Sequence, residues 1–253
     1  MRILGKKQYK NDGLRLFPDY STKFNDLYGF REFYIFLNNS IKYFLFNDSS
    51  NKNVILGLDG WLYWNFLNDK VIEDLKGDNQ FNALELQGWI NPIMEKTQLL
   101  TSMDIDYVFL VAPNKHTIYP EFIPDYLHPL KGPTRFDQIV EVLRKDYVLN
   151  LLDLRTTLNF SKKNARLFDK TDTHWNSVGA FYASNSLCRF LKHKHFDSLD
   201  IPILQLHSTT SKLTSGGNLS RLLYLQDYIN ELALKPEIGN LSSFTRENFL
   251  INN

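Results

Sequence analysis

The chain has 253 residues, of which 43% are hydrophobic and 14% aromatic, enough for a substantial core and too much for a disordered protein. Its 29 basic and 28 acidic side chains give a formal net charge of +1, without the basic excess of proteins that bind nucleic acid or anionic membranes, so nucleic acid is not an expected partner. The single cysteine, Cys188, has no partner for an internal disulfide.

The N-terminal sequence MRILGKKQYKNDG has too short an apolar run for a signal peptide, and the apolar region 30–46 is interrupted by charged and amide residues. We therefore expect neither a signal peptide nor a transmembrane helix. Residues 22–46 carry apolar side chains at helical spacing, which predicts a helix whose apolar face joins the core. These side chains are Phe24, Leu27, Tyr28, Phe33, Leu37, Ile41, Phe44 and Leu45.

The next segments predict a hairpin and a long helix. Two apolar runs, 54–58 and 61–64, flank Asp59-Gly60, a strong short-range hairpin signal. Residues 81–103 have a helical pattern.

Strand and helix patterns then alternate. The short apolar runs 106–112 and 147–152 predict buried parallel strands, and the amphipathic segment 134–145 between them predicts a connecting helix. In such a βαβ unit, ligands collect at the carboxyl ends of the strands. Residues 113–119 and 153–155 should lie at that edge.

The remainder predicts a helix over 177–191 that packs on the sheet, a strand over 203–214, and a short helix after Gly216-Gly217 with Asn218 as its N-cap. Beyond Glu231 the chain is polar and weakly patterned. No repeat or linker divides the sequence. We therefore expect one domain over 1–253, with an N-terminal helical and hairpin segment at 17–66, an α/β core at about 80–225 and a tail at 231–253.

Residues 172–176 (DTHWN) precede the helix at 177 and carry a candidate catalytic pair. If Asp172 accepts a hydrogen bond from Nδ1 of His174, it fixes the ring tautomer and leaves Nε2 free to take a proton from a serine hydroxyl. Alternatively, Asp172 caps the helix and His174 is an ordinary packed residue. Metal binding is a weaker alternative, because nothing nearby supplies the remaining ligands of a zinc site.

A set of segments in order resembles the cell-envelope SGNH-hydrolase-like family that includes the alginate O-acetylation proteins AlgJ and AlgX. The segments are FNDLYGFRE, VILGLDGWLYW, VAPNKHTIYPEFIP, LLDLRTTL and DTHWNSVGAFYA, within about 17–225. The resemblance implies a flavodoxin-like α/β three-layer sandwich with a mostly parallel sheet. It also implies a Ser-His-Asp triad that transfers acetyl groups on polysaccharide hydroxyls, with Asp172 and His174 as catalytic acid and base. No cofactor is expected.

The family's nucleophile follows the Asp-x-His segment in a Gly-Asp-Ser-Phe-like or Gly-Thr-Ser-Phe-like turn, and this sequence contains no such motif after His174. Ser49, Ser242 and Ser243 are weak substitutes, so the nucleophile is not assigned. The family's N-terminal anchor or signal peptide is also not recognisable. We therefore expect the chain to be truncated, with a sheet incomplete at its C-terminal side and a marginally stable fold.

Three further residues are candidates for substrate binding. Asn114 is a possible oxyanion donor. Lys115 could orient an anionic group, although a lysine at a strand end is usually solvated and structural. Trp175 could stack on a sugar ring or pack the helix start, and packing is the favoured alternative.

Two functions remain open from the sequence. The first is a polysaccharide O-acetyltransferase or acetylesterase, with a membrane-bound O-acyltransferase as a partner that the resemblance suggests. The second is an inactive or truncated component that binds polysaccharide or helps to assemble an exopolysaccharide system. For both, the resemblance implies the cell envelope or periplasm.

Overall fold

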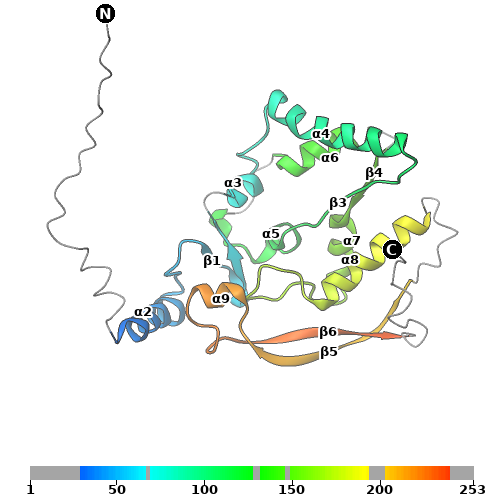
Figure 1. Cartoon of the computed structure of the whole chain (residues 1–253). Coiled ribbons are helices and arrows are strands. Elements are labelled where there is room, and N and C mark those ends of the chain that lie inside the picture. The colour runs from blue at the N-terminus through cyan, green and yellow to red at the C-terminus, as the bar shows by residue number, and fades with distance from the viewer. Residues whose placement is uncertain (1–28, 67–68, 128–131, 146–148, 194–202, 240–253) are drawn as a thin grey trace, which may run out of the picture.

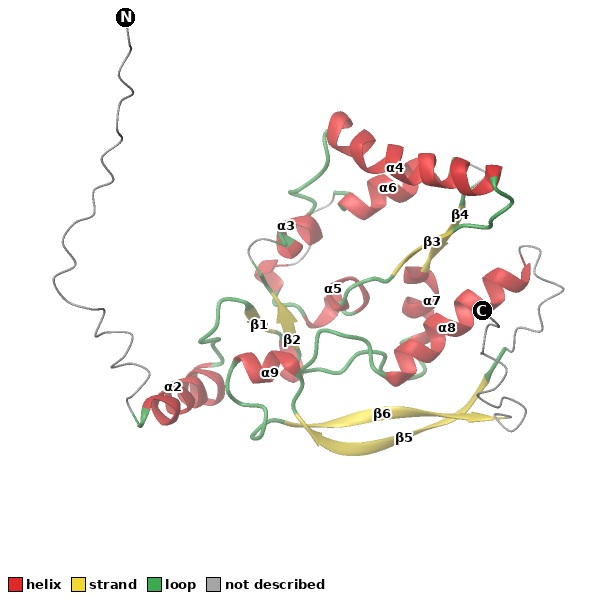
Figure 2. Cartoon of the chain, viewed as in Figure 1, coloured by secondary structure: helices red, strands yellow, loops and turns green. Residues whose placement is uncertain are grey.

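The computed structural model describes residues 29–66, 69–127, 132–145, 149–193 and 203–239. Within these ranges helices combine with three two-stranded sheets, one parallel and two antiparallel (Figures 1 and 2). The α/β class expected from the sequence is confirmed. The parallel component is limited to two strands in this part of the chain.

Helix α2 (Arg31–Phe46) confirms the helical pattern near the N-terminus but not its burial. Its contacts with the fold are made by few residues: Phe36 and Tyr43 pack on a small cluster, and the Asn39 side chain donates to the carbonyl of Leu223 at 2.7 Å. Figure 1 shows α2 at the periphery of the described fold, which is why most of its apolar face is exposed. The prediction that this face joins the core was wrong for Phe33, Leu37, Ile41, Phe44 and Leu45, which are exposed. Phe24, Leu27 and Tyr28 lie outside the described residues.

The predicted hairpin is confirmed as antiparallel strands β1 (Val54–Leu56) and β2 (Leu62–Trp64), with a 3₁₀ turn η1 (Leu58–Gly60) between them. Asp59 and Gly60 both have positive φ, 53° and 77°. Aspartate and glycine tolerate this left-handed backbone better than most residues, so the Asp-Gly pair encodes the turn.

Helices α4 (Ala83–Ser102) and α6 (Arg135–Leu143), which precede and connect the two parallel strands in sequence, both begin with a capping box. In α4, which follows α3 (Val71–Lys76), the capping box is formed by Asn82 and Glu85. Strand β3 (Val108–Val111), helix α6 and strand β4 (Asn150–Asp153) form the predicted βαβ unit, with β3 and β4 parallel. Both strands are half-buried rather than fully buried.

Short elements follow the carboxyl ends of these strands. Helix α5 (Lys115–Ile118) and the turns η2 (Pro120–Phe122) and η3 (Asp125–Leu127) come after β3. Helix α7 (Leu154–Ser161) comes directly after β4. Residues of both edges, including Pro113 and Arg155, line one common depression, as the topology predicts.

Helix α8 (Ser177–His193) packs against α7 and strand β6, and its Val178 and Ala183 belong to the main core together with Leu110 and Leu152 of the parallel strands. Helix α8 therefore packs on the parallel strands, as predicted, and also on β6, a strand of the C-terminal antiparallel hairpin.

The C-terminal described segment corrects two predictions. Strand β5 (Gln205–Ser215) pairs along its length with β6 (Asn230–Gly239), so residues 230–239 are a regular strand and not a weakly patterned tail. The hairpin is exposed along most of β5, and so the usual alternation of apolar and polar side chains is weak. Helix α9 (Asn218–Leu222) lies in the connection, and its N-cap is Gly217, one residue before the predicted Asn218.

No helix within the described ranges is long and apolar enough to span a membrane.

Candidate functional site

Asp172 and His174 lie in the loop before α8 and contact each other as the sequence predicted. Nδ1 of His174 lies 2.8 Å from Oδ1 of Asp172, and the backbone amide of His174 donates to the same oxygen at 2.9 Å. The histidine side chain is 79% exposed. In this arrangement the carboxylate holds a proton on Nδ1 and leaves Nε2 without one, which is the tautomer that a general base requires. The alternative of a packed histidine is not supported.

Asp172 is held as a carboxylate by donors on two sides. Its second oxygen, Oδ2, accepts a hydrogen bond from the backbone amide of Asn218 at 2.9 Å. Burial by itself would raise the pKa of Asp172, but the bonds from the His174 and Asn218 amides and from the His174 ring outweigh it, so the pKa lies below its usual value. The acid is therefore ionised at neutral pH, as an orienting partner requires.

The start of α9 is fitted closely to the Asp172 loop. A methyl group on Gly217 would lie 2.7 Å from both Cβ and Oδ2 of Asp172. The Asn218 side chain accepts from the Thr173 amide and donates to the Thr173 hydroxyl, at 3.0 and 2.7 Å. Gly217 thus allows the α9 backbone to approach the carboxylate, and Asn218 fixes Thr173, the residue between Asp172 and His174.

Glu231, a buried residue of β6, also binds this loop through its carboxylate. Oε2 of Glu231 accepts hydrogen bonds from the amide and the hydroxyl of Thr171, at 2.9 and 2.8 Å. Thr171 also accepts through its hydroxyl from the Gly217 amide at 2.7 Å. Burial raises the pKa of Glu231, and the nearby Asp169 carboxylate adds to this, against the bonds from Thr171 and the charge of Arg166.

Lys115, the first residue of α5, also binds this loop. Its ammonium donates to the carbonyls of Asp169, Lys170 and Asp172, at 3.1, 3.0 and 2.6 Å. The residue is only 2% exposed, and Nζ also lies over the rings of Trp61 and Tyr63. Burial lowers the pKa of Lys115 to about 7 despite the surrounding carboxylates.

The prediction that Lys115 is solvated was therefore wrong, while its structural role is confirmed. A lysine directly after a strand is usually free to reach water. Here the chain turns at once into α5 and carries the side chain beneath the Asp172 loop, where three carbonyls replace water.

Asn114 and Trp175 have local structural contacts. Oδ1 of Asn114 caps α5 by accepting from the amide and the hydroxyl of Thr117, at 3.0 and 2.9 Å. Trp175 packs against the main core and forms an isolated β-bridge with Phe168, which matches the packing alternative. A role of either residue in binding substrate stays a prediction.

The serine candidates remain unassigned. The Ser49 hydroxyl donates to the carbonyl of Asn51 at 2.7 Å and accepts from its amide, so it stabilises its own turn. Ser242 and Ser243 lie outside the described residues. Among the residues that the structure describes, no serine hydroxyl bonds to His174, and no group of three or more histidine, cysteine or acidic residues is arranged to bind a metal.

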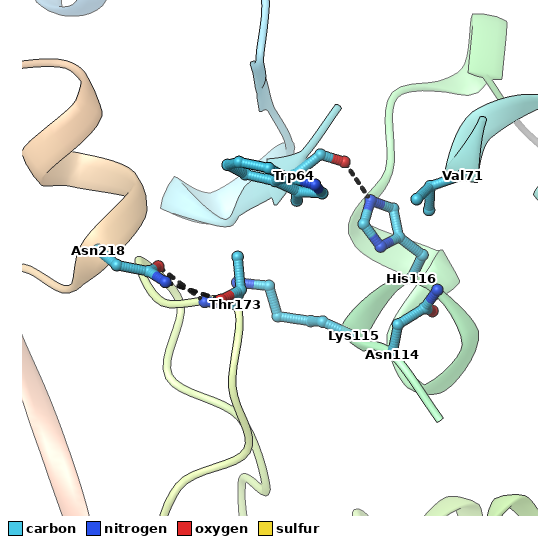
Figure 3. A pocket seen from close by; sticks show the side chains of 7 residues that line it. All are labelled: Trp64, Val71, Asn114, Lys115, His116, Thr173 and Asn218. Carbon is cyan, nitrogen blue, oxygen red and sulfur yellow. Dashed lines mark hydrogen bonds between the residues drawn. The ribbon is translucent and has the colours of Figure 1, made fainter. Parts of the chain in front are cut away.

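A pocket of about 290 Å³ is lined by Thr173, the residue between Asp172 and His174 (Figure 3). Thr173 reaches it from the Asp172 loop, and the other lining residues are Trp64, Val71, Asn114, Lys115, His116 and Asn218. Strand β2, helices α5 and α9 and the loop before α8 therefore converge here, although they are distant in sequence.

The sequence interpretation missed the contribution of four residues to this site. Gly217 and Asn218 were interpreted only as a helix start, although consecutive glycines followed by asparagine also signal a close backbone approach. Glu231 was placed in a weakly patterned tail. His116 gave no signal, because its place in the pocket depends on how α5 packs.

Comparison with known proteins gives the family. The model of the family described as "SGNH hydrolase-like domain, acetyltransferase AlgX" matches residues 54–248. A probable alginate O-acetylase AlgJ from Pseudomonas aeruginosa is 26% identical over 206 residues, 78% of this chain and 48% of the relative. The same protein from Pseudomonas syringae is 29% identical over 143 residues, 56% of this chain and 34% of the relative. The chain thus spans at most about half the length of these curated relatives.

Two solved structures are also similar. The O-acetyltransferase domain of Pseudomonas putida AlgJ aligns with a TM-score of 0.47 and 16% identity, over 74% of this chain and 65% of that one. Bacillus cereus PatB1 with a sulfonyl adduct aligns with a TM-score of 0.49 and 17% identity, over 74% and 57%. Because the family model covers well over half of the sequence, the chain belongs to the family of the SGNH hydrolase-like domain of acetyltransferase AlgX.

Proposed function

We propose that this chain acts in polysaccharide O-acetylation, as an O-acetyltransferase or acetylesterase of the cell envelope that uses Asp172 and His174. The observation that supports the proposal most directly is the 2.8 Å contact between Asp172 and Nδ1 of a histidine whose side chain is 79% exposed. Family membership and the names of the relatives, alginate O-acetylases, support polysaccharide as the substrate class.

The chemistry proceeds in two acyl transfers. Nε2 of His174 takes the proton of a serine hydroxyl as the serine oxygen attacks the acetyl carbonyl, and the imidazolium then returns the proton to the leaving group of the donor. A sugar hydroxyl, or water in an esterase, next attacks the acetyl-serine. His174 takes that proton and returns it to the serine. Asp172 stays ionised throughout and stabilises the imidazolium.

The nucleophilic serine and the acyl donor belong to the proposal and are not assigned to a residue or molecule. Ser242 and Ser243 are tested as nucleophiles because they follow the Asp-x-His segment in the sequence, and Ser49 is tested with them. A membrane-bound O-acyltransferase as supplier of acetyl groups is supported by the sequence resemblance alone.

The proposal is tested by hydrolysis of p-nitrophenyl acetate by the purified chain. His174→Ala should lower kcat/KM by about 10² to 10⁴-fold, the usual contribution of a general base. His193→Ala is the matched control, because His193 is an exposed histidine at the end of α8. Alanine at Ser49, Ser242 or Ser243 identifies the nucleophile if one of these variants loses activity as fully as His174→Ala.

The second candidate function is a polysaccharide-binding component without acetyl transfer. It is favoured by one observation, that no serine hydroxyl in the described ranges bonds to His174. Equal rates for the unmodified chain and His174→Ala, together with retained oligosaccharide binding, would select this alternative.

A further inference from the structure

The pocket lined by Thr173 contains a buried hydrogen-bonding atom for which the described residues supply no partner. One ring nitrogen of His116, Nε2, lies 2.9 Å from the carbonyl oxygen of Trp64. The other, Nδ1, is buried and has no hydrogen-bond partner in the described part of the chain. Figure 3 shows the ring beside the space between Trp64, Thr173 and Lys115. Leaving a buried polar atom without a hydrogen bond costs folding free energy, so we expect this nitrogen to bind a ligand atom.

The contact with Trp64 determines whether the partner of Nδ1 is a hydrogen-bond donor or an acceptor. A carbonyl oxygen only accepts, so Nε2 carries the hydrogen and Nδ1 of the neutral ring is an acceptor. Burial lowers the pKa of His116 to about 4, with a further contribution from the Lys115 charge, so the ring is neutral at physiological pH. The missing partner is therefore a hydrogen-bond donor.

The other polar groups of the pocket are largely committed. The Lys115 ammonium donates to three backbone carbonyls, and the oxygen and the nitrogen of the Asn218 side-chain amide both form hydrogen bonds with Thr173. Oδ1 of Asn114 caps α5, whereas no described acceptor takes a hydrogen from its amide nitrogen. Besides the Thr173 hydroxyl, the lining residues thus offer Nδ1 of His116 as acceptor, the amide nitrogen of Asn114 as donor and no uncommitted cation.

Trp64 supplies a firmly held apolar wall. Its indole Nε1 donates to Oδ2 of Asp69 at 2.9 Å, and its ring stacks on Phe66 with centroids 5.6 Å apart. A fixed aromatic face together with a few polar atoms suits a sugar ring, whose C–H face is apolar and whose hydroxyls both donate and accept. The volume of about 290 Å³ is at the lower end for ligand pockets.

We propose that this pocket binds an uncharged, hydroxyl-bearing sugar unit of the polysaccharide, with one hydroxyl donating to Nδ1 of His116 and the ring lying against Trp64. The inference rests on the proposed function for the presence of a polysaccharide at the site. A uronate carboxylate is disfavoured there, because it only accepts hydrogen bonds, would face the lone pair of Nδ1 and would find no free cation.

The test compares two oligosaccharides that differ at one position of each ring, the β-1,4-linked mannose tetramer and the β-1,4-linked mannuronate tetramer. The first has a hydroxymethyl group where the second has a carboxylate. Calorimetric titration of the full chain should give tighter binding of the mannose tetramer. Its binding should also shift the ¹⁵N NMR signal of Nδ1 of His116 in the unmodified protein.

His116→Phe keeps a ring of similar size but removes the Nδ1 acceptor together with the Nε2 donor to the Trp64 carbonyl. It should weaken binding of the mannose tetramer by about tenfold or more, one hydrogen bond being about tenfold. His193→Ala should leave binding unchanged. If the phenylalanine variant does not fold, the Nδ1 signal of the unmodified protein decides. Mannuronate binding as tight as mannose binding, or an unshifted Nδ1 signal at saturation, overturns the inference.

The two proposals fail separately. Hydrolysis that depends on His174 without mannose binding retains the catalytic proposal and rejects the sugar pocket. Mannose binding that shifts Nδ1, with no hydrolysis above the His174→Ala background, rejects the catalytic proposal and retains the pocket.

Discussion

Removing the buried ammonium that holds the Asp172 loop should change how the stability of the protein depends on pH. In Lys115→Met the side chain keeps its length and apolar stem but loses the donor to the carbonyls of Asp169, Lys170 and Asp172. The loss of this charged partner costs about 1 to 3 kcal/mol at pH 6, but the variant also removes the cost of burying the ammonium. The pH dependence of the difference in stability, rather than its value at pH 6, therefore tests the role of Lys115.

The pH dependence follows from the position of the lysine pKa. Burial lowers the pKa of Lys115 from 10.5 to about 7 in the folded protein. Between these values the unfolded chain holds a proton that the folded chain has released, so raising the pH favours the folded state. The free energy of unfolding should rise by about 1.4 kcal/mol per pH unit from this group alone, and by up to about 5 kcal/mol across the window.

The assay is urea unfolding followed by tryptophan fluorescence at intervals from pH 6 to 9.5. The quantity compared is the difference in free energy of unfolding between the unmodified chain and Lys115→Met, because other titrating groups cancel in it. This difference should increase above about pH 7. Lys192→Met, at the exposed end of α8, is the control variant. Parallel curves for the unmodified chain and Lys115→Met would refute the reasoning.

Two further substitutions test the supports of the loop, each by urea unfolding. Gly217→Ala should cost about 1 to 3 kcal/mol, because its methyl group would overlap Asp172, whereas Gly88→Ala, with open space around it, should gain about 0.5 to 1 kcal/mol; equal stability of the two variants would contradict the close approach. Glu231→Ala should cost about 2 to 4 kcal/mol by leaving two donors of Thr171 unpaired, and Glu231→Gln, which keeps an acceptor oxygen, should cost about 1 kcal/mol or less. A glutamine variant as unstable as the alanine variant would show that the carboxylate charge, and not the acceptor, is what matters.

The sequence predicted those features of the fold that depend on residues close together in the chain. The Asp59-Gly60 pair placed the hairpin, because its two residues adopt the left-handed backbone of the turn. The short apolar runs predicted both parallel strands, and two-residue spacing predicted the contact between Asp172 and His174.

What could not be predicted depends on contacts between distant segments. Strand β6 was missed because its polarity is inverted: Glu231 is 8% exposed and Leu232 is 51% exposed. The two donors of Thr171 and the ion pair with Arg166 explain a carboxylate on the inner side. The burial of Lys115 likewise follows from the path of a loop more than fifty residues further along the chain.

The loop that carries Asp172 is fastened by residues from α5, α9 and β6, which span most of the described sequence. During synthesis the chain leaves the ribosome from its N-terminus, so Lys115 and the Asp-x-His segment emerge well before Glu231. The loop therefore gains its full set of supports only once the β5–β6 hairpin has docked. A nascent chain that stops short of β6 would contain both residues but would lack the Glu231 carboxylate that binds Thr171 beside them.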